Sequence, residues 1–180
     1  MRWTDFDWRF SSTKRILEAL SDGLKEEEGG VDETQESDQV DEILEHTEEL
    51  LGIAFTTAQT YICGTVSDVN RFLKPRSQQT KEQLLKEYSE KLPASETTKM
   101  ELCNAVANYY KHHEEWVSWS EIGRHQKTVS ILRAAGIEET DSFPCRKAAN
   151  TLWTNDEGSD LEPLLRMISD WRRSVIAAFR

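Results

Sequence analysis

The sequence lacks any long apolar run. A helix that crosses a bilayer takes about 20 mainly apolar residues, and no stretch of the 180-residue chain approaches that length. The opening residues, MRWTDFDWRF, contain no apolar segment of the kind found in a secretory signal. We therefore expect a cytoplasmic protein that makes no contact with a membrane.

Cysteine is scarce, and the three cysteines lie far apart in the sequence. No CxxC pair occurs, which argues against a zinc knuckle. Cys63 and Cys103 lie among apolar residues at helical spacing, which predicts small core side chains in a reducing compartment. No histidine is tied by sequence to Cys145, so nothing assigns it the role of a nucleophile. We expect no metal and no other cofactor.

Turn and phosphate-loop signatures are missing as well. No Asn-Gly or Asp-Gly pair separates two alternating apolar runs, since Asp22-Gly23 lies inside a helical pattern. No glycine-rich phosphate loop occurs, which excludes Rossmann, P-loop and kinase folds in practice. The signals that remain are helical.

Apolar residues recur at spacings of three and four along most of the chain, as in amphipathic helices. Ile16, for example, belongs to the apolar stripe of the first segment, which Gly29-Gly30 ends. The sequence predicts a single all-α domain over residues 1–180, a bundle of five to seven helices with one long central helix. The expected helical segments are 11–28, 37–73, 78–91, 95–116, 120–135, 143–153 and the residues from 160 onward.

The second segment is long enough to be the central helix of the bundle. Its apolar period runs from Val40 to Phe72, and a helix of that length spans about 50 Å. Gly52 and Gly64 interrupt it, and each either weakens the helix or marks the close approach of another helix. A stripe left uncovered on this helix would be a surface for a homodimer.

The net charge of −11 is concentrated in one part of the chain. Residues 26–50 hold 12 Asp or Glu and no Lys or Arg, so the remaining residues sum to about +1. One interpretation is a solvated acidic loop over 26–36 followed by a helix start, where acids are favoured. The other is a binding surface for a basic protein partner. Either way the segment repels nucleic acid, so a contact with RNA must come from elsewhere.

The segment NAVANYYKHHEEW, residues 104–116, combines a core face with a polar face. Leu102, Val106 and Tyr109 follow helical spacing and face the core. Lys111 lies four residues before Glu115, which predicts an ion pair between them. The polar stripe consists of Asn104, Asn108, Lys111, His112 and Glu115. It is either the solvent face of an amphipathic helix or a reactive site.

The stripe has the residue types that metal-free RNA cleavage needs. A histidine can move protons near neutral pH, and a nearby lysine stabilises phosphate charge. Adjacent His112 and His113 diverge by about 100° on a helix, which does not suit a metal chelate.

Trp116 and Trp119 are expected to cover the end of the bundle. The N-terminal segment RWTDFDWRF either docks on the bundle or forms a partner-binding arm.

A second basic cluster lies in the last helix. Arg172, Arg173 and Arg180 fall near its C-terminus, where cations are favoured. The cluster is either an exposed helix end or a phosphate contact.

The segment ANYYKHH resembles the motif of HEPN domains. HEPN domains are small helical bundles, often dimeric, and many are metal-independent ribonucleases of toxin–antitoxin and antiphage systems. Their motif has an arginine, a polar residue and then a histidine. Asn108 matches the polar position and His112 the histidine, whereas Ala107 stands where the arginine belongs. Either Lys111 or a distant arginine substitutes, or the domain is not a nuclease. The candidate arginines are Arg71, Arg76 and Arg124.

The chain is also similar to small bacterial proteins of unassigned function with the pattern N-x-x-K-H-x-x-E-W, here Asn108 to Trp116. A T-x-x-I-L-x-x-x-G-I helix follows, here Thr128 to Ile137. The two patterns together cover about 35 residues, and the helical layout agrees more loosely.

The resemblance implies a bacterial defence or toxin-system protein that binds or cleaves RNA. Asn108, Lys111 and His112 are then the catalytic candidates. The candidates for binding are His113, Glu115, Arg71, Arg76 and Arg124. The alternative is an antitoxin, immunity or adaptor subunit that binds a basic partner through residues 26–50. Whether the protein is an enzyme stays open at this point.

Overall fold

The computed structural model describes residues 7–29, 37–73, 78–116, 118–121, 123–153 and 160–180, without the side chains of 37, 38 and 124. Within these ranges no β-strand occurs, and the one isolated bridge joins Lys91 and Thr98. The prediction of an all-α bundle with one long central helix is confirmed. None of the described helices is both long and apolar enough to cross a membrane.

Seven α-helices and three shorter helical turns make up the described chain. In chain order they are α1 (Phe10–Gly29), α2 (Ser37–Asp68), the π-helical η2 (Val69–Leu73), α3 (Lys81–Glu87), α4 (Lys99–His112), η3 (His113–Glu115), η4 (Gly123–His125), α5 (Gln126–Ala134), α6 (Pro144–Leu152) and α7 (Glu162–Ala178).

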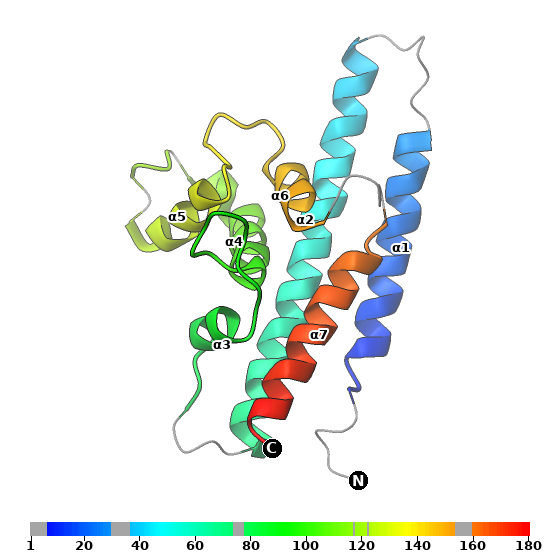
Figure 1. Cartoon of the computed structure of the whole chain (residues 1–180). Coiled ribbons are helices and arrows are strands. Elements are labelled where there is room, and N and C mark those ends of the chain that lie inside the picture. Colours follow the sequence, from blue (N-terminus) through cyan, green and yellow to red (C-terminus); the bar gives the residue numbers. More distant parts are fainter. Residues whose placement is uncertain (1–6, 30–36, 74–77, 117, 122, 154–159) are drawn as a thin grey trace.

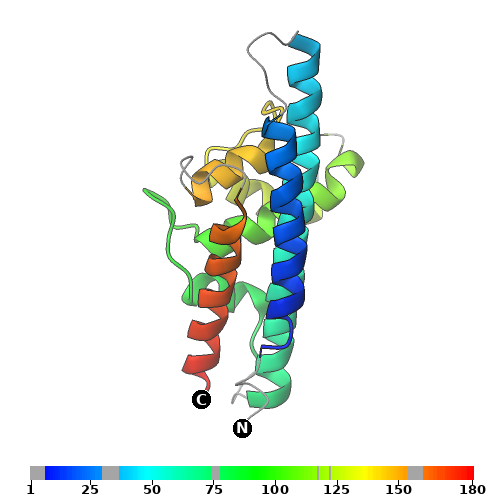
Figure 2. The ribbon, with the colours of Figure 1, turned by 90° about the vertical axis from the view of Figure 1, so that its right-hand side faces the viewer.

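The helix α2 continues directly into η2 and is the central element of the fold (Figure 1). In Figure 1, α1 lies on one side of α2, and α3, α4 and α5 lie on the other. Figure 2 shows α1 running beside α2, whereas α7 lies beside the C-terminal half of α2. The core between these helices includes Phe55, Ile62, Leu102 and Leu164, all of them fully buried.

Two helix starts differ from the predicted boundaries because threonines cap them. The helix α4 begins at Lys99 rather than at 95, since the Thr98 hydroxyl accepts from the N–H of Glu101 and the Glu101 carboxylate accepts from the N–H of Thr98. Thr80 and Gln83 form the same reciprocal pair at α3, which is shorter than the expected 78–91. Such a capping box satisfies two helix N–H groups that have no partner within the helix.

The helix α6 is capped by a side chain from another helix. The carboxylate of Glu48 in α2 accepts from the N–H of Cys145 at 2.6 Å and from the N–H of Arg146 at 2.9 Å. Phe143, just before α6, provides no side-chain cap. Burial raises the pKa of Glu48, although the two N–H donors act in the opposite direction. Glu48 thereby fixes α6 against α2.

Both glycines of α2 mark close approaches. A Cβ atom at Gly52 would lie 2.1 Å from the Tyr110 ring of α4, and one at Gly64 would lie 2.3 Å from Nε of Arg9. Glycine at these positions therefore lets α4 and the start of α1 lie closer to α2 than any other residue would allow.

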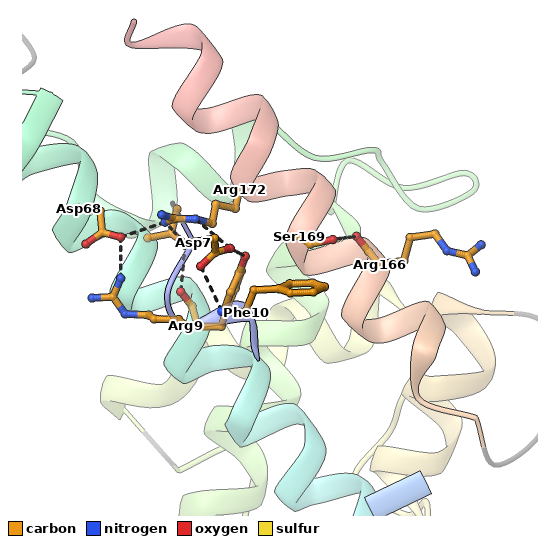
Figure 3. Close-up of polar contacts among 9 residues, drawn as sticks. Asp7, Arg9, Phe10, Asp68, Arg166, Ser169 and Arg172 are labelled. Atoms are coloured by element: carbon orange, nitrogen blue, oxygen red, sulfur yellow. Dashed lines mark hydrogen bonds and ion pairs between the residues drawn. The ribbon is translucent and has the colours of Figure 1, made fainter. Parts of the chain in front are cut away.

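A buried charge network fastens α7 and the segment before α1 to α2 (Figure 3). Arg172 is 4% exposed and binds Asp68 at 3.0 Å and Asp7 at 3.1 Å. Arg9 binds the same oxygen of Asp68 at 2.5 Å, and the Tyr61 hydroxyl donates to Asp7. Two arginines face two aspartates, so the buried charges balance, as a low-dielectric interior requires. The expectation that the N-terminal segment docks on the bundle holds for Asp7 to Arg9; residues 1–6 lie outside the described part.

Several predicted burial assignments are wrong. Cys103 is fully buried, but Cys63 is exposed, and Ile16 and Phe72 are 47% and 42% exposed. These three side chains lie on helix faces that stay largely open to solvent, which the spacing of apolar residues cannot reveal. Arg172 is buried instead of exposed at a helix end, because Asp68 and Asp7 neutralise it.

Residues 26–28 were expected both at the end of the helix 11–28 and in the acidic loop 26–36; they belong to α1, and residues 30–36 lie outside the described part. Trp119 is 7% exposed and Trp116 is half-buried; both pack against the core, as expected for side chains that cover the end of the bundle.

We predict that Gly52→Ala destabilises the protein by about 1–3 kcal/mol, because the new methyl group overlaps the Tyr110 ring. Gly29→Ala is the matched control, since nothing lies within 4 Å of a Cβ atom there. Urea unfolding followed by circular dichroism measures both changes. Equal stability of the two variants would contradict the close approach.

We predict that Asp68→Ala lowers the free energy of unfolding by about 3–5 kcal/mol, because it leaves Arg172 buried without its main partner. Asp170→Ala removes an exposed carboxylate that pairs with exposed Arg173 and should change stability by less than about 1 kcal/mol. Thermal unfolding of both variants tests the difference. Similar losses of stability in the two variants would show that the buried charge network does not stabilise the fold.

Candidate functional site

The polar face of α4 lies against α2, and one glutamine side chain connects the two helices. Gln59 of α2 is 6% exposed. Its Nε2 donates to Oδ1 of Asn104 at 2.9 Å and to Oδ1 of Asn108 at 2.8 Å. Its Oε1 accepts from Nζ of Lys111 at 2.5 Å. A single carboxamide thereby binds three side chains on successive turns of α4.

These hydrogen bonds fix how the two asparagines are turned. Because the side-chain oxygens of Asn104 and Asn108 accept from Gln59, their amino groups lie on the other side of each amide and point away from Gln59. An asparagine amino group can only donate, so it suits an anion.

Both asparagines line a pocket of about 240 Å³ between α3, α4 and the η4–α5 segment. Side chains from all three walls carry polar groups into it. The lining residues are Lys81, Glu82, Leu85, Glu101, Asn104, Ala105, Asn108, His112, His125, Lys127, Thr128 and Ile131.

Two histidines face each other in this pocket. The ring centroids of His112 and His125 are 5.3 Å apart, and both side chains are half-buried. Nδ1 of His112 lies 3.3 Å from the carboxylate of Glu115, which orients the ring. Trp116 packs against the ring of His125 with centroids 5.2 Å apart. Two imidazoles this close can serve as proton acceptor and proton donor in one reaction.

The charges of the pocket balance when both histidines are neutral. Lys81 and Lys127 contribute two positive charges, and Glu82 and Glu101 contribute two negative ones. The carboxylate of Glu101 is engaged by the N–H of Thr98 at 2.9 Å. These four charges therefore cancel, and the amino groups of the asparagines are the donors that favour an anion in the pocket.

Lys111 lies beside the pocket and is not among the residues that line it. Burial lowers the pKa of Lys111, and the positive charge of Lys81 lowers it further. The predicted ion pair between Lys111 and Glu115 is wrong, because Lys111 binds Gln59 and Glu115 binds His112. The helical spacing lets Glu115 pair with either Lys111 or His112. The packing of α4 on α2 brings Lys111 to Gln59 and leaves Glu115 with His112.

His113 points away from the pocket, as the helical angle between adjacent histidines predicts. Its Nδ1 lies 3.0 Å from the carbonyl oxygen of Tyr110, and its ring stacks on Tyr109 with centroids 5.0 Å apart. Burial raises the pKa of Tyr109 to about 12. This aromatic group packs the end of α4 and does not border the pocket.

Of the three arginines considered as substitutes, only Arg71 is fully described, and it is not among the residues that line the pocket. Arg71 is exposed on η2, and its guanidinium lies 5.3 Å from the ring of Phe72. Arg76 lies outside the described residues. The backbone of Arg124 is part of η4, but its side chain is outside the described part. Ala107 is fully buried, so the cations beside the pocket come from Lys81 and Lys127 instead of from that position.

Four residues of this site were not identified from the sequence: Gln59, Lys81, His125 and Lys127. A signal existed for Gln59, which is the only side-chain amide in an uncharged stretch from 50 to 67. The other three come from segments distant in sequence, and only the fold brings them to α4.

Among the residues that the structure describes, no group of three His, Cys, Asp or Glu side chains is arranged to hold a metal ion. A scan against protein-family models, a search of curated proteins and a search of solved structures each found no match to this chain.

We predict that Gln59→Leu lowers stability by about 1–3 kcal/mol, because it leaves the oxygens of Asn104 and Asn108 without a donor. Gln126→Leu, at an exposed position of α5, is the control and should change stability by less than about 0.5 kcal/mol. Lys81→Ala should raise the pKa of Lys111, because burial and the positive charge of Lys81 lower it and the substitution removes the charge. Proton NMR of the lysine side chains follows this second effect.

Proposed function

We propose that the protein is a HEPN-like bacterial defence or toxin-system protein that binds RNA in the pocket beside α4 and cleaves it without a metal. The observation that carries the proposal is the pair of imidazoles, His112 and His125, with ring centroids 5.3 Å apart in a pocket that also holds asparagine amides and lysines. Phosphodiester cleavage by the 2′-hydroxyl needs a base, an acid and donors for the phosphate oxygens.

Each group has a role in this proposal. One imidazole of the pair removes the proton of the 2′-hydroxyl, and the other protonates the departing 5′-oxygen. Asn108 and the two pocket lysines bind the phosphate oxygens. Lys111 acts as a positioning residue, because it holds the Gln59 carboxamide that orients Asn108.

The pocket has acidic as well as basic side chains, which limits its affinity for a phosphate. Glu82 and Glu101 face the same space as Lys81 and Lys127. The two carboxylates therefore oppose the attraction of the two lysines for an RNA phosphate and weaken its binding. Binding should also weaken with added salt.

A second function is favoured by the position of the acidic residues. The antiparallel α1 and α2 bring exposed acids from both helices to one end of the bundle (Figure 1). The described exposed acids there are Glu26, Glu28, Asp41, Glu42 and Glu45. We propose as the alternative that this end binds a basic protein, in an antitoxin, immunity or adaptor role. This function does not need His112, so one experiment separates the two.

We predict that His112→Ala lowers the rate of RNA cleavage by about 10²–10⁴-fold while the fold is retained. The assay uses purified protein and a labelled single-stranded RNA in the presence of EDTA. His46→Ala and His113→Ala are matched controls, because His46 pairs with Glu27 at the far end of α2 and His113 points away from the pocket. Both should keep the activity of the unaltered protein.

Unchanged cleavage in His112→Ala, with normal circular dichroism, would remove the catalytic assignment. Absence of cleavage by the unaltered protein would reject the ribonuclease and favour the acidic binding surface.

A further inference from the structure

One face of α2 has no charged residue over a long distance. From residue 50 to residue 67 the sequence contains no Asp, Glu, Lys, Arg or His, although 31% of the chain is Asp, Glu, Lys or Arg. Part of this stretch is nevertheless open to solvent: Ile53 is 41% exposed, and Thr60, Cys63 and Ser67 are also exposed. A solvent-facing helix surface normally has charged side chains.

Half-buried Thr57 and exposed Thr60 make this face less polar than the sequence suggests. The Thr57 hydroxyl donates to the carbonyl oxygen of Ile53 at 2.9 Å, and the Thr60 hydroxyl donates to that of Thr56 at 3.1 Å. With the hydroxyls bonded to their own helix, the threonines present their methyl groups outward.

The exposed residues form one continuous line on the helix. Ile53, Thr60 and Ser67 are seven residues apart, which places them on the same side of α2. Gln59 faces α4 and Asp68 faces Arg172 of α7, so these neighbours occupy other sides of the helix.

The two ends of the line have opposite charges. Exposed Glu49, whose carboxylate also accepts from the Tyr110 hydroxyl at 2.6 Å, lies eleven residues before Thr60, and exposed Arg71 lies eleven residues after it. A twofold axis through Thr60 that runs two copies antiparallel would therefore place each Glu49 opposite the Arg71 of the other copy. The same axis places Ile53 opposite Ser67 and Thr57 opposite Cys63. A parallel arrangement would instead place like charges together.

We propose that this face of α2 is the interface with a second copy of the chain, with the helices antiparallel and the twofold axis at Thr60. In a twofold interface the same surface of both copies meets, so that surface must be complementary to itself. The pairing of Glu49 with Arg71 of the other copy meets this condition and favours a second copy over an unrelated partner. The line from Glu49 to Arg71 spans about 33 Å. A contact of this size forms a reversible dimer with a dissociation constant in the range of about 1–100 µM. The proposal does not depend on the ribonuclease function.

The charge pairs are tested by exchanging them. Glu49→Arg and Arg71→Glu should each weaken dimerisation about tenfold, because each change turns two symmetry-related attractions into repulsions. The double variant should restore the dissociation constant of the unaltered protein to within about threefold. Glu26→Arg, which makes the same charge change on α1, should leave it unchanged. Sedimentation velocity at 1–200 µM measures all four proteins.

The register is tested with cysteines. Cys63 is the exposed one of the three cysteines, while Cys103 and Cys145 are buried. In a Cys63→Ser background, Thr60→Cys should form a disulfide-linked dimer under mild oxidation, because the two sulfurs lie at the axis. Ile53→Cys in the same background should stay monomeric on a non-reducing gel, because its copies are about 21 Å apart along the helices.

Three results would overturn the proposal. A monomer at 200 µM excludes the dimer. Failure of the double variant to restore dimerisation excludes the charge register. Crosslinking of Ile53→Cys as efficient as that of Thr60→Cys indicates parallel helices.

Discussion

The carboxamide of Gln59 is the contact on which the candidate site depends. It presents a pair of donors to two asparagine oxygens and an acceptor to a lysine, all on one face of α4. No other side chain of this length does both: leucine offers neither group, and a glutamate would pair with Lys111 but repel the oxygens of Asn104 and Asn108. Because Gln59 is buried, its hydrogen bonds are strong and an unpaired group there is costly. The polar stripe of α4 is therefore oriented by α2 and is only partly open to solvent.

This contact requires that α4 lie close to α2, and other features of α2 hold the surrounding helices in place. Gly52 admits the ring of Tyr110, while Glu48 caps α6 and Asp68 binds the buried guanidinium of Arg172. These three residues of α2 contact three different helices, α4, α6 and α7. The central helix thus determines the spacing of the walls around the pocket, and the remaining open face of α2 is left for a second copy. In this arrangement the site and the proposed interface lie on different faces of one scaffold.

The fold followed from the sequence to a large extent, and the site followed only in part. The apolar period gave the helices and the long α2, because periodicity depends on local geometry. It failed for Cys63 and Ile16, and the place of Arg172 near a helix end did not reveal its burial, because burial depends on which neighbour covers a face. The polar stripe identified Asn108 and His112, which do line one pocket. His125, Lys81 and Lys127 could not be found in this way, since no local pattern links α3 and η4 to α4. The predicted partner of Lys111 was Glu115 on the same helix, but Lys111 binds Gln59 of α2, which the sequence of α4 alone does not reveal.

The central claim is that a scaffold built around Gln59 holds two imidazoles and a set of donors around one phosphate. The most direct measurement is a titration with inorganic phosphate followed by NMR of the histidine ring protons. The account predicts that the signals of His112 and His125 move along the same binding curve and that the signals of His46 stay in place. If the His112 and His125 signals do not move, or if they move no more than those of His46, the pocket does not bind phosphate and the account is contradicted.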